Sequence, residues 1–334
     1  MNDKPFFSIV IPTYNKAMRV SDCIASIVAN TFDDYEIIVV DDASTDDTGS
    51  TLANNFSDIF GDKLKYIQNS VNRSAAYSRN RAFKICKGEW IFNLDNDNLI
   101  FPDTLQKLHD FILKYPEFKY GALLSYNVYE HTFMTFGGDI NWFTSRFIEF
   151  QKDLFYKQNI ELDDIPSLGL KEYYPTVANV PNATFLHRSV LDYVKGFNII
   201  YEYGFEDPDF FIRIHRAGFK GAICGQIITM HMHFYRECKK PDVMKKFGIK
   251  NARSAYLGCT TSRAAYLSTR NRSWMMKYLA PWYGKIVYFL FPAWIPGLYY
   301  SFKALQEGRF RFAWASFKGM LVGNLLPPPK QRFE

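Results

Sequence analysis

Cysteine is scarce in this chain of 334 residues, and its few cysteines do not show the spacing of a metal or redox pair. The five cysteines include no C-x-x-C pair and are odd in number, so we expect neither a disulfide framework nor a zinc site. The N-terminus has no basic segment followed by an apolar core, so we expect no secretory signal. These absences predict a protein of a reducing compartment, the cytoplasm.

Glycine-rich phosphate loops and long apolar runs are missing as well. Neither G-x-G-x-x-G nor G-x-x-x-x-G-K-[ST] occurs, which excludes a dinucleotide fingerprint and a P-loop. The segment 286–300 has fifteen uncharged residues, and Pro292 and Pro296 lie within it. A spanning helix needs about 20 apolar residues without helix-breaking prolines. We therefore expect no full span there, and an interfacial or re-entrant segment is left open.

Charge and aromatic residues are present in quantity, and the charge is unevenly distributed. The net charge is +6, but residues 239–334 carry 17 Lys and Arg against 3 Asp and Glu, whereas residues 1–238 have a net charge of −8. A basic, aromatic segment beside an apolar stretch is typical of proteins that rest on anionic membranes. A solvated basic face over an ordinary core is the alternative. No recognition motif accompanies the charge, so we expect no nucleic-acid partner.

The first hundred residues alternate between the patterns of strands and helices. Apolar runs typical of buried strands lie at 6–11, 36–40, 64–68 and 90–94, and helical spacing lies at 20–29, 46–56 and 74–86. Continuous rather than alternating apolar strands favour a parallel sheet with helices on both faces. Right-handed crossovers then give a Rossmann-like, doubly wound sheet.

The same alternation continues less regularly to about residue 231. Helices are expected at 103–115, 189–194 and 207–217, and strands at 120–128, 182–186 and 227–231. Residues 131–180 have mixed character, and we expect them to form loops or a small excursion over the active edge of the sheet.

Polar residues follow the predicted strands where ligands bind in a doubly wound sheet, at the carboxyl ends. They read PTYN at 12–15, DDAS at 41–44 and DNDN at 95–98. Asp95 and Asp97, without a nearby His or Cys, suit Mg²⁺ or Mn²⁺, whose remaining ligands come from substrate phosphates. Because Asp and Asn are also common turn residues, a structural turn is the alternative.

Four ordered motifs resemble the family-2 inverting glycosyltransferases with the GT-A fold. They are VIPTYN at 10–15, VVDDAS at 39–44, YSRNRAFKICKGEWIFNLDNDN at 77–98 and GFEDPDFFIRI at 204–214. The resemblance covers about residues 8–233 and implies an α/β fold with a mostly parallel sheet flanked by helices. We expect a catalytic domain at 1–238 and a basic, aromatic-rich, mainly helical extension at 239–334. Within the domain, residues 1–100 would bind the nucleotide-sugar and 101–238 would carry the acceptor site and base.

The resemblance also implies roles for individual residues. The donor nucleotide would be bound by Pro12, Tyr14, Asp42, Arg79, Asp95 and Asn96. Tyr14 and Asp42 match the positions that contact the base, usually uracil, and Arg79 matches the arginine that reaches the diphosphate. Asp95 and Asp97 would hold Mn²⁺ or Mg²⁺, with Asp97 in direct contact.

His231 is a candidate further ligand of the metal or diphosphate, with His233 as its rival and a buried structural histidine as the alternative. Asp207 matches the carboxylate that takes the proton of the acceptor hydroxyl, and Glu206 would orient the acceptor. Favourable charge at a helix N-terminus is the alternative explanation of this acidic pair.

The resulting hypothesis is transfer of one sugar from a UDP-sugar to a hydroxyl of a surface glycan or a polyprenyl-diphosphate-linked acceptor. Polymerising relatives carry Q-x-x-R-W and several spanning helices, and this chain has neither, so we predict single additions. We place the protein on the cytoplasmic face of the membrane. A sugar nucleotidyltransferase is one alternative, although PTYNKAMR replaces its glycine-rich loop. A non-catalytic nucleotide-sugar or glycan-binding module is the other.

Overall fold

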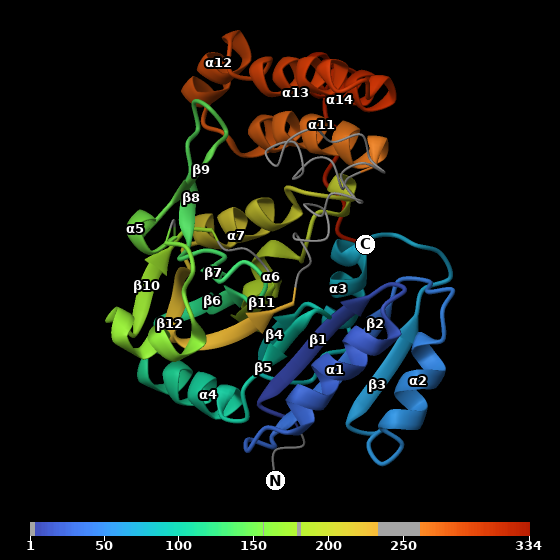
Figure 1. Ribbon diagram of the computed structural model, residues 1–334, viewed down its shortest axis with the longest axis vertical. Coiled ribbons are helices and arrows are strands. Elements are labelled where there is room, and N and C mark those ends of the chain that lie inside the picture. Colours follow the sequence, from blue (N-terminus) through green and yellow to red (C-terminus); the bar gives the residue numbers. More distant parts are fainter. Residues whose placement is uncertain (1–3, 156, 179–181, 233–260) are drawn as a thin grey trace.

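The central sheet is built largely from the apolar runs that the sequence predicts as strands (Figure 1). The structure is a computed structural model that describes residues 4–155, 157–178, 182–232 and 261–334. The strand order is β10-β12-β6-β11-β4-β1-β2-β3, with β5 paired to β12 and β7 paired to β6. The strands are β1 (Phe7–Thr13), β2 (Tyr35–Asp41), β3 (Leu64–Gln68), β4 (Trp90–Leu94), β5 (Asn98–Ile100), β6 (Phe118–Asn127), β7 (Thr132–Phe133), β10 (Tyr173–Thr176), β11 (Ala183–His187) and β12 (Lys220–His231).

The sheet is mixed, with a parallel half and a half that contains antiparallel pairs. β3, β2, β1 and β4 are parallel neighbours, as continuous apolar strands predict. β11 is antiparallel to both β4 and β6, whereas β6 and β12 are parallel to each other. The parallel half therefore brings the ends of β1, β2 and β4 to one edge of the sheet.

Helices cover both faces of the sheet. They are α1 (Ala17–Val28), α2 (Thr48–Asn55), α3 (Ala75–Phe83), α4 (Thr104–Lys114), α6 (Val190–Val194) and α7 (Glu206–Arg216). The side chains of α1, α2 and α4 pack into one core cluster with Ile9 and Val39. Those of α3, α6 and α7 pack into another with Val10 and Val40. Alternate residues of each strand thus face opposite cores.

Residues 131–180 contain more regular structure than the loops we expected. They form β7, β10, the short hairpin of β8 (Gly138–Ile140) and β9 (Phe147–Glu149), α5 (Lys152–Phe155) and a 3₁₀ helix (Leu162–Leu168). Side chains of this region pack with Tyr126 into a separate cluster that includes Phe136 and Ile165. β10 pairs with β12, about fifty residues further along the chain, so no local periodicity marks it.

A layer of helices lies beyond α7 and forms the top of the molecule in Figure 1. Its members are α11 (Ser262–Leu279), α12 (Trp282–Leu290), α13 (Ile295–Gln306) and α14 (Phe310–Leu325). Pro292 lies in the break between α12 and α13, and Pro296 lies in the first turn of α13. Among the described residues, no helix combines the length and hydropathy needed to cross a membrane.

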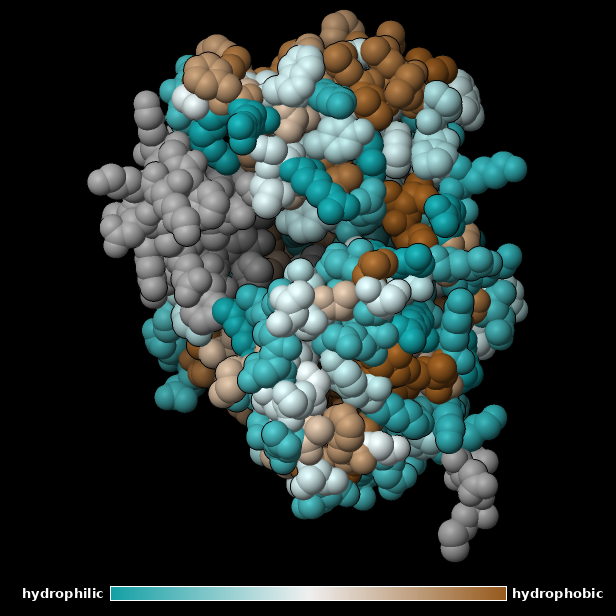
Figure 2. All heavy atoms as spheres, turned by 90° about the vertical axis from the view of Figure 1, so that its right-hand side faces the viewer, coloured by the Kyte–Doolittle hydropathy of each residue, from teal (hydrophilic) through white to brown (hydrophobic). Residues whose placement is uncertain are grey.

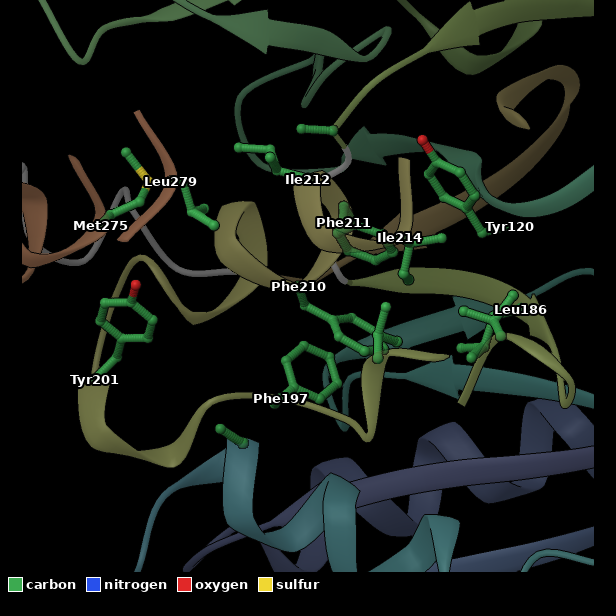
Figure 3. Packing of buried hydrophobic residues seen from close by; sticks show 14 of the residues in the cluster. Tyr120, Leu186, Phe197, Tyr201, Phe210, Phe211, Ile212, Ile214, Met275 and Leu279 are labelled. Carbon is green, nitrogen blue, oxygen red and sulfur yellow. The ribbon is translucent and has the colours of Figure 1, made fainter. Parts of the chain in front are cut away.

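The layer is joined to the sheet and the helices that cover it, which we call the sheet body, by packing and by the end of the chain. Met275 and Leu279 of α11 belong to the same core cluster as Phe210 and Phe211 of α7 (Figure 3). After α14 the chain returns toward α3, where the side chain of Asn80 donates a hydrogen bond to the Phe333 carbonyl at 3.1 Å.

Candidate active site

The site lies where β1, β2 and β4 end. The backbone N–H of Asp42 donates to the Thr13 carbonyl at 2.8 Å, and the side chain of Asn96 donates to the Thr13 hydroxyl at 3.0 Å. Tyr14 follows β1 and is 45% exposed, whereas Pro12 is buried within the strand. Tyr14 is therefore available for stacking on a planar ring. The contact of Pro12 with the donor stays a prediction.

Asp42 organises the loop that precedes α3. It is 3% exposed, and its carboxylate accepts from the backbone N–H groups of Arg73 and Ser74 at 2.9 and 2.7 Å. The side chain of Asn69 donates to the same carboxylate at 2.7 Å. Sequence reasoning did not single out Asn69, Arg73 or Ser74, because a polar loop carries no periodic signal. Direct contact between Asp42 and a nucleotide base stays a prediction.

Arg79 joins two motifs that are more than a hundred residues apart. Its guanidinium is 4% exposed and lies 2.5 Å from Asp95 Oδ1 and 3.9 Å from Asp207 Oδ1. Burial opposes the charge of Arg79, but Asp95, Asp207 and Glu206 outweigh it and raise the pKa of the guanidinium. The arginine is thus charged, and it bridges the start of α7 and the turn that contains Asp95 and Asp97, which we call the D-x-D turn.

The D-x-D turn holds carboxylates that repel each other. Burial raises the pKa of Asp95, and Asp97 raises it further, while Arg79 acts in the opposite direction. Asp97 Oδ1 lies 3.4 Å from Nε2 of His231, which is buried at the end of β12. The structure therefore brings Asp97 and His231 together, and the predicted rival His233 lies outside the described residues.

The side chains of Asp95, Asp97 and His231 fit a hard divalent cation that takes some of its ligands from a substrate. Within the described part of the chain, no three His, Cys, Asp or Glu side chains are grouped so that they could hold a metal by themselves. Mg²⁺ and Mn²⁺ are commonly bound by one or two carboxylates together with substrate phosphates and water. Asp97 and His231, with Asp95 two residues away, provide a partial set of that kind.

Glu206 and Asp207 form a half-buried acidic pair at the start of α7. Burial raises the pKa of Asp207 well above the usual range, and the neighbouring Glu206 raises it further, against the effect of Arg79. Burial also raises the pKa of Glu206. One oxygen of each, Glu206 Oε2 and Asp207 Oδ1, is buried and accepts no hydrogen bond from the described residues. A carboxylate with a raised pKa and an oxygen that accepts no hydrogen bond is suited to take a proton from a bound hydroxyl.

The sequence of this region matches a known family. Residues 8–168 match the model of glycosyl transferase family 2. The chain carries a family-2 glycosyltransferase domain. The "Putative glycosyltransferase EpsE" of Bacillus subtilis (strain 168) is 33% identical over 119 residues, which cover 36% of this chain and 42% of EpsE. The matched part of this chain therefore spans less than half the length of that curated relative.

Solved structures resemble nearly the whole chain in fold. GalNAc-T7, solved with UDP, GalNAc and Mn²⁺, has a TM-score of 0.61 and 13% identity, with 100% of this chain and 60% of that chain covered. S. aureus TarS 1-349 has a TM-score of 0.51 and 16% identity, with 93% and 91% covered. At these identities the likeness shows the fold alone, and it confirms the predicted GT-A class with a helical C-terminal region.

Proposed function

We propose that this chain is a metal-dependent, inverting glycosyltransferase that moves one sugar from a UDP-sugar to an acceptor hydroxyl. The observation that carries the proposal is the bridge by Arg79, 2.5 Å from Asp95 and 3.9 Å from Asp207. It places a cation between the turn that would face a diphosphate and the carboxylate that would serve as base. The UDP and Mn²⁺ in the GalNAc-T7 structure support the same donor and metal.

The proposed reaction is a single displacement. The acceptor oxygen bonds to the anomeric carbon of the donor sugar, and the bond from that carbon to the nucleoside diphosphate breaks. Asp207 takes the proton of the acceptor hydroxyl, and Glu206 orients that hydroxyl. Arg79 donates toward the diphosphate side, where negative charge builds up. A divalent cation held by Asp95, Asp97 and His231 would supply further neutralisation of the leaving diphosphate.

The acidic pair at the start of α7 favours this proposal over its two alternatives. A nucleotidyltransferase joins two phosphates and does not need a base directed at an acceptor hydroxyl. A non-catalytic module does not need a half-buried carboxylate with a raised pKa, because burial of a carboxylate has an unfavourable desolvation cost. Asp207 is a half-buried carboxylate of this kind, with a pKa raised by burial and by Glu206.

A donor screen tests the proposal. Purified protein is incubated with UDP-, GDP- and dTDP-sugars and a lipid-diphosphate acceptor, with and without Mn²⁺, and nucleoside diphosphate release is measured. Asp207→Asn should lower transfer by about 10²–10⁴-fold, the usual contribution of a general base, while UDP binding is kept. Asp192→Asn on α6 is the matched control and should leave transfer unchanged. No metal-dependent release from any donor would contradict the proposal.

We further propose that the acceptor is presented at an anionic membrane, on which the helical layer rests. More than half of the described large apolar side chains that are exposed belong to α12, α13, α14 and their flanks. They are Trp282, Tyr283, Ile286, Val287, Leu290, Phe291, Ile295, Leu298, Tyr299, Phe302, Leu305, Phe310, Trp314, Leu325 and Leu326. Figure 2 shows apolar side chains gathered at the top of the molecule, where this layer lies. We call these side chains the apolar face.

The charge of the same helices supports lipid rather than protein as the partner. Residues 282–326 contain five Lys and Arg against one Glu. Basic residues beside exposed aromatic rings suit the headgroup region of an anionic bilayer, and an apolar surface this extensive is unusual on a monomer. A polyprenyl-diphosphate-linked or surface glycan would be reached from this position, on the cytoplasmic side of the membrane.

A further inference from the structure

The turn that leads into α7 has an unusual backbone. The N–H of Tyr203 donates to the Tyr201 carbonyl at 2.7 Å, and Glu202 between them has φ 61° and ψ −43°. This is the geometry of the γ-turn with positive φ, which is rare and strained. Gly204 follows with φ 72°, which glycine adopts readily, and Phe205 with φ 74°, which residues with a Cβ atom rarely adopt. Such conformations persist only where the surrounding structure holds them.

One side chain of the helical layer holds this turn. Asn271 of α11 is fully buried, and its Nδ2 donates toward the carbonyls of Tyr201, Tyr203 and Gly204 at 2.6, 2.9 and 3.2 Å. Its Oδ1 accepts from Nε of Arg270 at 3.0 Å, which fixes the orientation of the amide. Three carbonyl oxygens that converge on one point repel each other unless a donor lies between them.

Neighbouring residues of α11 strengthen this contact. Arg270 donates to the Ile200 carbonyl at 3.2 Å and lies over the ring of Trp274 at 3.9 Å. Arg263 pairs with Glu202 at 2.5 Å. The same helix therefore contacts the backbone and one side chain of the turn.

We infer that Asn271 is a positioning residue for the base of the proposed reaction. It is fully buried and acts by fixing the turn from which Glu206 and Asp207 extend. The inference rests on the proposed function, because it assigns the purpose of the contact to the placement of Asp207. It makes α11 a part of the catalytic apparatus and links the apolar face to the base through one helical layer.

Asn271→Asp tests the inference, because aspartate has nearly the same shape but no N–H donor. We expect kcat to fall by about 10²-fold, the usual effect of a misplacement of about 1 Å, with donor KM and UDP binding within about twofold of wild type. Asn324→Asp is the matched control, since Asn324 lies in the same layer and donates to the Ala293 carbonyl at 3.1 Å. It should leave kcat unchanged. Asn271→Ser should give an intermediate loss and serves if the aspartate variant does not fold.

Hydrogen exchange provides a readout that does not depend on activity. Amides of residues 201–207 should exchange faster in Asn271→Asp than in Asn324→Asp, whereas amides of β1 and β4 should not change. Unchanged kcat and unchanged exchange in the Asn271 variants would overturn the inference. So would equal losses of kcat and UDP binding, which indicate a general structural defect. If the wild type transfers no sugar, the proposed function fails, and exchange alone then decides whether Asn271 holds the turn.

Discussion

Arg79 is the side chain at which the two halves of the candidate site meet. A guanidinium presents five N–H donors in a rigid plane, so it can face Asp95 and Asp207 at the same time, whereas an ammonium group is a point charge. Because Arg79 is 4% exposed, both carboxylates depend on it for charge compensation. We therefore expect UDP binding and transfer to depend on the guanidinium group of Arg79, and not only on a positive charge at this position.

Replacement of Arg79 by lysine tests this reasoning. We expect Arg79→Lys to lower both UDP binding and transfer by at least about tenfold, and to lower the free energy of unfolding by about 1–3 kcal/mol, the usual cost of an unpaired buried polar group. Isothermal titration with UDP and urea unfolding measure the two effects. Arg216→Lys on α7 is the control, because Arg216 lies over the ring of Trp142 and outside the site. Wild-type UDP affinity in Arg79→Lys would contradict the prediction.

The acidic pair predicts a pH dependence of transfer. Burial and Glu206 raise the pKa of Asp207, and a base is active only when deprotonated, so kcat should rise with pH through this raised pKa. In Glu206→Gln the neighbouring carboxylate is gone, so the pKa of Asp207 should fall and the acid limb of the kcat profile should move to lower pH. A surface variant, Glu172→Gln, should leave the profile in place. A limb that stays in place or moves to higher pH in Glu206→Gln would show that Asp207 is not the titrating base.

At the scale of elements, the helical layer depends on a close crossing of α11 and α14. A Cβ atom at Gly319 would lie 2.2 Å from Thr269 Oγ1 and 2.3 Å from the Tyr266 carbonyl. Gly323, one turn further, lies against the backbone of Arg270. Only glycine allows this approach, which in turn places α11 against the turn before α7.

We therefore expect Gly319→Ala to destabilise the protein by about 1–3 kcal/mol, the usual cost of overpacking, although alanine favours helix formation. Urea unfolding followed by circular dichroism measures the change. Lys318→Ala, at the neighbouring exposed position of α14, should be neutral or slightly stabilising. Equal stability of Gly319→Ala and wild type would mean that the two helices can separate without cost.

At the scale of the whole molecule, the apolar face and the candidate site belong to different layers. The sheet body carries the acidic site, and the helical layer carries exposed rings together with basic residues. Residues 261–334 contain eleven Lys and Arg against two Glu, which is a large part of the net charge of +14 of residues 239–334, whereas residues 1–238 have a net charge of −8. It also predicts that membrane binding and chemistry can be impaired separately.

Vesicle flotation tests the membrane part. The triple variant Phe302→Ser, Phe310→Ser and Trp314→Ser should bind vesicles with anionic lipid at least about tenfold more weakly. Each aromatic ring that inserts into the bilayer contributes about 1.5–3 kcal/mol to the free energy of membrane binding. Binding of the wild type should also weaken in high salt. Leu113→Ser and Tyr193→Ser, at exposed apolar positions of the sheet body, form the control. Flotation of the triple variant like wild type would refute the apolar face as the attachment surface.

The sequence by itself determined the elements whose pattern is local. The strand predicted at 64–68 has the observed bounds Leu64–Gln68, and most helices differ from prediction by one or two residues. Burial of a strand on both faces, or of a helix on one, depends on residues two to four positions apart, so it can be read from the chain. The four motifs and the separation of charge are likewise visible in the sequence.

Only the tertiary structure decided which distant residues meet. The contact of Arg79 with Asp207 joins residues 128 positions apart, and that of Asn271 with Tyr201 joins residues 70 positions apart. The same holds for β10, which pairs with β12, and for the side of α12 to α14 that is left exposed. Such contacts depend on how whole layers pack and on where the chain returns, and no spacing of neighbouring residues encodes them.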